Sequence, residues 1–128
     1  MKRTLILLIV LGCFYSPTFA QDSAAAKPDF IHITTVESIL GGGVGRSKMI
    51  ITKTDGSSEE KEMNNLFSLV GINFKNIKQN EVNIITTLKG YTDEGWKLLS
   101  VTPLTLSPSQ SENGIFLTRY LLSKTNGK

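Results

Sequence analysis

Few side chains in this sequence have the type and spacing for chemistry, and three stand out: Glu37, Arg46 and Arg119. Arg46 follows the glycine-rich stretch Gly41–Gly45, whose backbone N–H groups could grip an anion or a partner together with the guanidinium. Arg119 lies in the middle of a predicted strand, where it either extends from the sheet toward water or pairs with Glu37 or Glu94. We treat Glu37, Arg46 and Arg119 as candidate ligand-binding residues. A concave pocket that holds all three would support this hypothesis.

The glycine-rich stretch does not match the motifs that bind nucleotides. A phosphate-binding loop needs a glycine, four residues, and then Gly-Lys-Ser/Thr. Here Leu40 stands where the first glycine should be, and Arg46 replaces the lysine. A dinucleotide fingerprint needs a third glycine, but Arg46 or Lys48 occupies that position. We expect an ordinary loop and no cofactor.

Catalytic and metal-binding clusters are not indicated either. His32 is the only histidine, so one chain cannot build a histidine relay or a cluster of imidazole ligands, and we expect His32 to be a half-buried structural residue. The acidic residues follow no spacing that would place two carboxylates across one cleft, and Glu59–Glu62 is an ordinary solvated charge run. The sequence therefore assigns no catalytic residue and no metal ligand.

Residues 1–20 have the three parts of a secretory signal peptide. Two basic residues follow Met1, Thr4–Tyr15 is an apolar run too short to span a bilayer comfortably, and Thr18–Ala20 has small residues at the cleavage positions. We predict an exported protein, periplasmic or secreted, with a mature chain that begins at Gln21 and has no transmembrane segment.

An alternative form of export is lipidation at Cys13. The residues Val10-Leu11-Gly12-Cys13 resemble a loose lipobox, which would make the protein a lipid-anchored component of an envelope assembly. The apolar stretch before Cys13 is short, and the aromatic residues Phe14 and Tyr15 would follow the lipid directly. These features favour cleavage after Ala20 over lipidation.

Removal of the signal changes what the composition implies. The mature chain keeps 108 of the 128 residues, enough for one domain, and 12 of the 14 basic residues against 11 acidic ones. Part of the basic pI therefore belongs to the signal, and we predict no nucleic-acid partner. Because Cys13 is the only cysteine, the mature chain forms no internal disulfide and must be stabilised by packing.

The stretch Glu81–Thr102 organises the predicted fold. Asn80 is the expected N-cap of a helix, and Gly95 is its expected stop, because glycine adopts the left-handed conformation without a Cβ clash. Trp96 follows at once, and we expect its indole to pin the helix to the strand that it begins. The apolar residues at helical spacing are Val82, Ile84, Ile85, Leu88 and Tyr91.

The remaining patterns predict an α+β domain over residues 28–124, after a frayed lead-in at 21–27. We expect an antiparallel sheet of about four strands, with one main helix and one short helix packed on one face. Asp55-Gly56 is a tight-turn signal, after which residues 57–62 form either a short polar strand or a loop. The expected strands are 30–36, 46–53, 96–102 and 115–122, and the expected short helix is 63–70, ended by Gly71.

The last predicted strand is apolar on both faces. Ile115, Leu117 and Leu121 alternate with Phe116, Tyr120 and Leu122, and the first strand also has apolar residues on both sides. One layer of helix covers only one face of a sheet, and an exposed apolar face usually marks an interface. We expect the second face to be covered by residues 63–77, by a second copy of the chain in a homodimer, or by an envelope protein.

With these residues in view, the chain resembles a family of small uncharacterised bacterial domains with a G-W-E-L corner between helix and strand, in particular its exported branch in Gram-negative bacteria. The resemblance implies a small α+β sheet domain, and it carries no activity and no catalytic residue. Lys97 stands where the corner of that family usually has an acid, so the resemblance assigns no role to that side chain. The residues that carry the resemblance are Thr34–Ser38, Gly45-Arg46-Ser47, Phe67-Ser68, Gly71-Ile72-Asn73, Glu94-Gly95-Trp96 with Leu98, and Thr118-Arg119-Tyr120.

The function that these observations favour is non-enzymatic binding by an exported domain. A lipid-anchored envelope component and a hydrolase of unrecognised type are the alternatives, the hydrolase being disfavoured because the usual catalytic groups are few.

Overall fold

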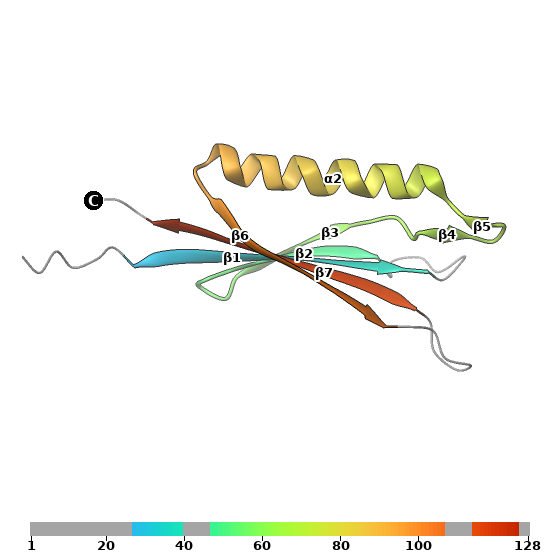
Figure 1. The fold of residues 1–128 in the computed structure, drawn as a ribbon, viewed down its shortest axis with the longest axis horizontal. Coiled ribbons are helices and arrows are strands. Elements are labelled where there is room, and N and C mark those ends of the chain that lie inside the picture. Colours follow the sequence, from blue (N-terminus) through green and yellow to red (C-terminus); the bar gives the residue numbers. More distant parts are fainter. Residues whose placement is uncertain (1–26, 40–46, 107–113, 126–128) are drawn as a thin grey trace, which may run out of the picture.

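One helix lies along one face of a five-stranded antiparallel sheet in the computed structural model, which describes residues 27–39, 47–106 and 114–125 (Figure 1). The strand order is β3-β2-β1-β7-β6, so the first and last strands of the chain are neighbours in the middle of the sheet. The predicted α+β class and antiparallel sheet are confirmed. The elements are β1 (Pro28–Ser38), β2 (Lys48–Lys53), β3 (Ser58–Glu62), β4 (Phe67–Ser68), β5 (Gly71–Ile72), α2 (Phe74–Asp93), β6 (Lys97–Leu106) and β7 (Ile115–Thr125).

The sheet has one strand more than predicted, because β3 pairs with β2 along its whole length. The turn between them closes where the Asp-Gly pair predicts it: the Gly56 N–H donates to the Lys53 carbonyl at 3.0 Å, and Gly56 has φ 83°. A positive φ of this size is strained for any residue with a Cβ, so glycine is required there. All five residues of β3 are exposed, which explains why no apolar alternation identified the strand.

The predicted short helix at 63–70 is wrong. The backbone N–H groups of Met63 and Leu66 donate to the carbonyls of Ser47 and Ser38, both at 3.0 Å, so this segment follows the edge of the sheet. It then forms the small β4–β5 hairpin. A helix of two turns is marginal on its own, and here hydrogen bonds to distant backbone replace its internal ones.

Helix α2 begins at Phe74 rather than at Glu81, about two turns before the predicted start. Asn73 is the N-cap, and its side chain accepts a hydrogen bond from the Asn76 N–H at 3.2 Å. Asn80, predicted as the cap, is instead fully buried inside the helix. Val82 and Ile85 lie on the exposed side, with 48% and 65% of their surface accessible.

The helix ends at a sharp corner. Gly95 has φ 92°, and the Trp96 N–H donates to the Tyr91 carbonyl at 3.0 Å. The Trp96 and Tyr91 rings meet edge to face, with centroids 6.2 Å apart, and both pack against the core. Strand β6 then continues through Pro103 to Leu106, beyond the predicted end at Thr102.

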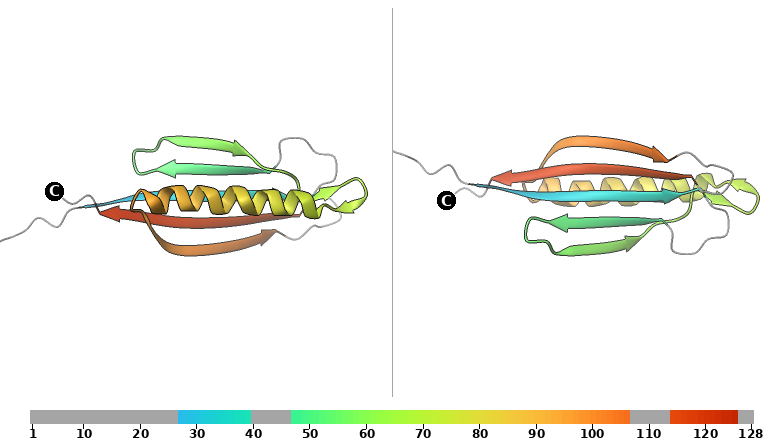
Figure 2. Two further views of the ribbon diagram at one scale, coloured as in Figure 1. Left: turned by 90° about the horizontal axis from the view of Figure 1, so that it is seen from above. Right: turned by 90° about the horizontal axis from the view of Figure 1, so that it is seen from below.

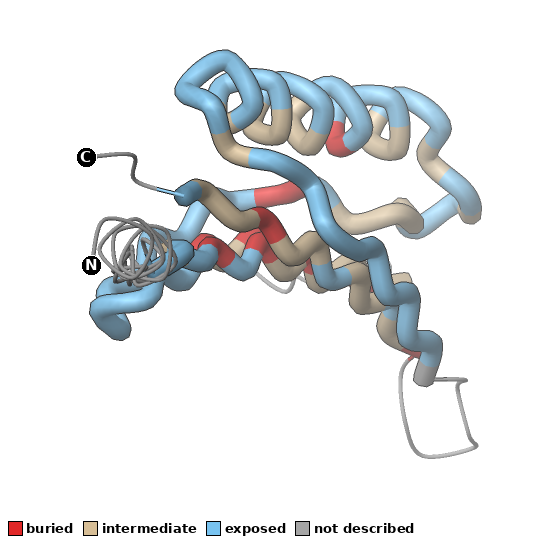
Figure 3. The backbone as a smooth tube through the Cα atoms, turned by 60° about the vertical axis from the view of Figure 1, so that its left-hand side comes forward, coloured by how far each residue is buried: buried red, intermediate tan, exposed pale blue. Residues whose placement is uncertain are grey.

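The core lies between α2 and the middle of the sheet, where the buried residues gather (Figures 2 and 3). From the helix, Ile84, Leu88 and Tyr91 pack against it. This core is small, and within the described residues its buried apolar members are Ile31, Ile33, Met49, Ile51, Met63 and Leu122.

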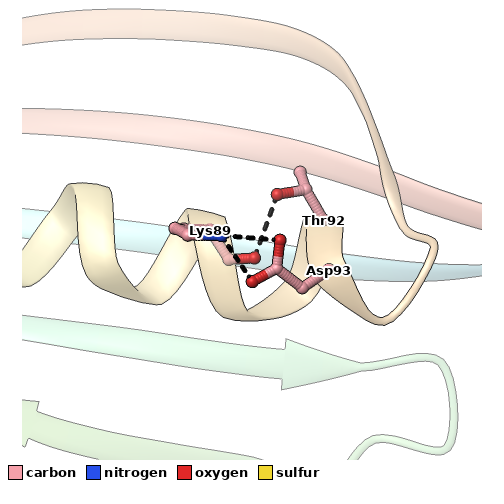
Figure 4. A network of polar contacts seen from close by, with 3 residues as sticks. All are labelled: Lys89, Thr92 and Asp93. Carbon is pink, nitrogen blue, oxygen red and sulfur yellow. Dashed lines mark hydrogen bonds and ion pairs between the residues drawn. The ribbon is translucent and has the colours of Figure 1, made fainter.

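The outer surface of α2 is polar toward its C-terminal end. The Lys89 ammonium contacts both carboxylate oxygens of Asp93 at 2.8 and 2.7 Å, and the Thr92 hydroxyl donates to the Lys89 carbonyl at 3.0 Å (Figure 4). Exposed pairs of this kind contribute little to stability. Within the described residues, no helix is long and apolar enough to cross a membrane.

Candidate functional site

The structure does not bring the predicted ligand-binding residues together. Glu37 is half-buried and points to the helix side of the sheet, because it alternates with the buried Ile33 and Thr35. Arg119 is exposed and pairs with Thr34, so it points to the opposite side. Arg46 lies outside the described residues, as do the cleavage region, Cys13 and the glycine-rich stretch.

Glu37 belongs to a partly buried polar network beneath α2 that the sequence analysis did not predict. At its centre, Asn80 donates through Nδ2 to Glu37 Oε1 at 3.0 Å and to the Asn64 carbonyl at 2.8 Å. Its Oδ1 accepts from the Asn64 N–H at 2.9 Å. One side chain thus connects the middle of the helix, the segment before β4 and the end of β1.

A second set of bonds extends this network toward the start of β2. The buried Ser47 hydroxyl donates to Asn65 Oδ1 at 2.9 Å and accepts from the Ser38 N–H at 3.0 Å. Asn76, one turn before Asn80, donates to the Asn65 carbonyl at 2.8 Å. No buried side-chain polar atom of the described residues lacks a partner. Because its hydrogen bonds are satisfied internally, we assign the network to the positioning of residues 63–66 rather than to ligand binding.

A signal for this network is present in the sequence, although it is weak. Asn73, Asn76 and Asn80 recur at helical spacing in front of the apolar residues of α2. A helix register that starts at Phe74 would have placed Asn80 on the core-facing side, next to Ile77 and Ile84.

Two tyrosines border the network and the corner. Burial, together with the nearby charge of Glu37, raises the pKa of Tyr120 above its ordinary value of 10.0. Burial also raises the pKa of Tyr91, with smaller contributions from the carboxylates of Glu59 and Glu94. Both phenols therefore stay neutral at physiological pH, and neither is tuned to act as a base.

A shallow polar groove runs between α2 and the β2–β3 edge. Its volume is about 350 Å³, and it is lined by Lys53, Lys61, Thr86, Thr87, Gly90, Tyr91 and Glu94. The Lys61 ammonium lies 3.7 Å from Glu59, so its charge is partly balanced. Within the described residues, no three acidic or histidine side chains come together in a way that could hold a metal ion.

The surface with the most distinctive character is the face of the sheet opposite α2, which we call the open face. It is bare in the view from below, where the sheet lies in front of the helix (Figure 2). The expected cover by residues 63–77 is wrong, because Met63 and α2 pack on the helix side. His32, expected to be half-buried, is exposed there. The strand registers place the apolar residues Phe30, Val36, Ile50, Leu104, Ile115, Leu117 and Leu121 on this face.

The charges of the open face are divided between its two halves. The β2–β3 half has Glu60 and Glu62, with Lys48 bound to Glu60 at 2.6 Å. The β6–β7 half has Arg119 and Lys97, and no acidic residue among its described positions. The face is therefore acidic along one edge and basic along the other, and between them the apolar side chains are mixed with His32, Thr34 and Thr52.

Comparison of the chain with protein-family models, with curated proteins and with solved structures finds no match.

Proposed function

We propose that the protein is an exported, non-enzymatic binding module whose contact surface is the open face of the sheet. The observation that carries this proposal is the apolar band across that face, which no described element covers. Phe30 and Leu104 on this face are exposed, with 41% and 47% of their surface accessible, and the other five apolar residues are half-buried. Burying a large apolar side chain fully stabilises by roughly 1.5–3 kcal/mol relative to exposure. A face with several of them is stabilised by a partner.

The partner that we propose first is a second copy of the chain. Strand β1 has 11 residues and the sheet has five strands. At ~3.3 Å per residue and ~4.8 Å between strands, the face measures on the order of 700 Å². Stable interfaces bury about 800 Å² on each partner, so a face-to-face pair of sheets is of suitable size.

The division of charge supports a particular arrangement of the two copies. A two-fold axis parallel to the strands and passing over β1 places β3 of one copy above β6 of the other. Glu62 then lies near the basic half of the partner surface, and Arg119 lies near the acidic half. A two-fold axis perpendicular to the strands would set like charges against each other, which is unfavourable.

Both edges of the sheet are poorly suited to the alternative of edge-to-edge pairing. β3 is short and has four charged residues among its five, Ser58–Glu62. β6 contains Pro103 and a register shift between Leu98 and Ser100. Charges, proline and bulges on edge strands oppose pairing with another chain, which leaves the open face as the favoured contact.

Light scattering after size exclusion, over roughly 1–100 µM protein, tests the proposal. We expect twice the chain mass at the upper concentrations. Glu62→Lys and Arg119→Glu should each weaken the dimer, and the double variant should restore it. Glu81→Lys, an exposed charge change on α2, is the matched control and should have no effect. A monomer at every concentration contradicts the dimer.

Export is tested separately by mass spectrometry of the mature N-terminus. We expect a chain that begins at Gln21. A diacylated Cys13 would instead establish the lipid-anchored alternative and rule out the soluble form.

A further inference from the structure

The end of the molecule beyond the start of α2 carries an exposed group of large apolar side chains, which we call the apolar tip: Leu69, Val70, Ile72 and Phe74. Their accessible fractions are 89%, 97%, 53% and 75%. Three of these values are the highest among the described large apolar residues. The tip includes the β4–β5 turn, which projects past the helix at the end of the sheet opposite the first residues of β1 (Figures 1 and 2).

The tip is held by defined hydrogen bonds. Phe67 pairs with Ile72 and Ser68 with Gly71, the Ser68 hydroxyl donates to the Gly71 carbonyl at 3.3 Å, and the Asn73 N–H donates to the Leu66 carbonyl at 2.9 Å. Much of the polar backbone around the turn is therefore satisfied before any contact is made. An apolar environment requires this, since it offers no water to unpaired groups.

The backbone does not explain why the turn residues are apolar. The positive φ that this turn requires is adopted by Gly71, at 115°. No described residue other than glycine has a positive φ, so Leu69 and Val70 occupy ordinary conformations. Tight turns favour glycine, proline, asparagine, aspartate and serine at such positions. A leucine and a valine there expose apolar surface with no benefit to the fold.

Within the described residues, the charges closest to the tip along the chain are positive. Lys75 and Lys78 lie on the first turns of α2 and are exposed, and no acidic residue occurs between Met63 and Asn80. Phe74 and Lys78, four residues apart, share one side of the helix. The first turn of α2 has no acid to offset the positive end of the helix dipole.

We propose that residues 69–78 bind reversibly to the surface of an anionic lipid bilayer, with the apolar tip inserted at the boundary between headgroups and acyl chains. A small convex protrusion of aliphatic and aromatic side chains, bordered by lysines, combines the two forces that hold peripheral proteins on such membranes. A convex tip fits a deformable lipid layer, whereas a protein partner would need a matching pocket. This contact uses a different surface from the open face, so the two proposals can fail independently.

Sedimentation of the protein with vesicles tests the contact. We expect binding to vesicles that contain phosphatidylglycerol, weaker binding to pure phosphatidylcholine, and a decrease with added salt. Leu69→Ser combined with Val70→Ser should weaken binding by about tenfold or more, since it removes two large side chains from the inserted group. Lys75→Glu combined with Lys78→Glu should abolish the preference for anionic lipid. All four positions are exposed, so the variants should remain folded, which circular dichroism checks.

The apolar run at residues 4–15 could itself bind vesicles, so a second experiment measures insertion at the apolar tip directly. Tryptophan introduced as Val70→Trp should shift its emission to the blue and be quenched by brominated lipids. Val82→Trp is the matched control, because Val82 is an exposed apolar residue on α2 outside the tip. Equal quenching at both positions, or vesicle binding that is unchanged in the Leu69→Ser, Val70→Ser variant, overturns the proposal. Absence of binding to either kind of vesicle also overturns the proposal. The apolar tip would then be expected to bind an apolar pocket on a partner protein.

Discussion

Glu37 and Arg119 occupy the two central strands of the sheet and point to opposite faces. Arg119 is aligned with Thr34, three residues before Glu37, and the odd difference places their side chains on different sides. Glu37 accepts a hydrogen bond from the buried Asn80, whereas Arg119 lies on the open face. The Glu37 carboxylate therefore holds Asn80 inside the fold, and the exposed Arg119 guanidinium can contact a partner.

Substitutions at these two positions should separate stability from association. Glu37→Leu should lower the free energy of unfolding by about 1 kcal/mol or more, because Asn80 loses an acceptor in a buried site. Arg119→Glu should change it by less than about 0.5 kcal/mol and weaken the dimer. Urea unfolding at low protein concentration, together with sedimentation velocity, measures both. Loss of stability in the arginine variant alone would contradict the assignment.

Asn80 should be the polar residue whose removal costs most. Asn80→Ala removes a fully buried side chain and leaves the partly buried N–H and carbonyl of Asn64 without their partners, and we expect a loss of about 2–4 kcal/mol in unfolding free energy. Asn83→Ala is the matched control. Asn83 lies on the same helix and accepts an exposed hydrogen bond from Gln79, so the effect should stay within about 0.5 kcal/mol. Equal effects at both positions would argue against the network.

Two glycines near the end of α2 should respond to alanine with opposite signs. Gly90 lies inside the helix, and a Cβ there would meet no atom within 4 Å, so Gly90→Ala should stabilise by about 0.5–1 kcal/mol. Gly95 has φ 92°, and Gly95→Ala should destabilise by about 1–2 kcal/mol through backbone strain. Thermal unfolding of the two variants is the measurement. A stabilised Gly95→Ala variant would mean that the corner is not held in this conformation.

Alkaline pH should weaken the fold through Tyr120. Its pKa is raised above 10.0 in the folded state, so the unfolded chain releases the phenolic proton first. The contribution to stability is therefore complete below pH 10 and is lost as pH rises through the folded-state pKa. Unfolding measured at about pH 9 and pH 11 should show a smaller decrease in Tyr120→Phe than in the parent. Every other side chain is the same in the two proteins, so the comparison isolates the phenol. Identical decreases would contradict the shift.

Parts of the fold could be predicted because their causes are local in the chain. Alternation along β1 separates Ile31 from Phe30, alternation along β7 separates Leu122 from Leu121, and the structure has Ile31 and Leu122 buried. The turn at Asp55-Gly56 follows from the ability of glycine to adopt a positive φ. In each case the deciding residues are within a few positions of one another.

Other parts depended on contacts between residues far apart in the sequence. Asn80 resembles an N-cap when read alone, but its partners are 16 and 43 residues away, and these contacts place it inside a longer helix. Residues 63–70 have apolar spacing typical of a helix, yet the backbone N–H groups of Met63 and Leu66 donate to the carbonyls of Ser47 and Ser38. The charged segment Ser58–Glu62 forms the strand β3 because its backbone pairs with that of β2.

The sequence by itself determined that the sheet would be apolar on both faces, because period-two alternation follows directly from the extended backbone. Only the tertiary structure decided which face α2 covers, which face stays open, and that Glu37 and Arg119 are separated by the sheet. These properties depend on how the strands align and where the helix lies, and a buried hydrogen bond is favourable only once both of its partners have been brought together.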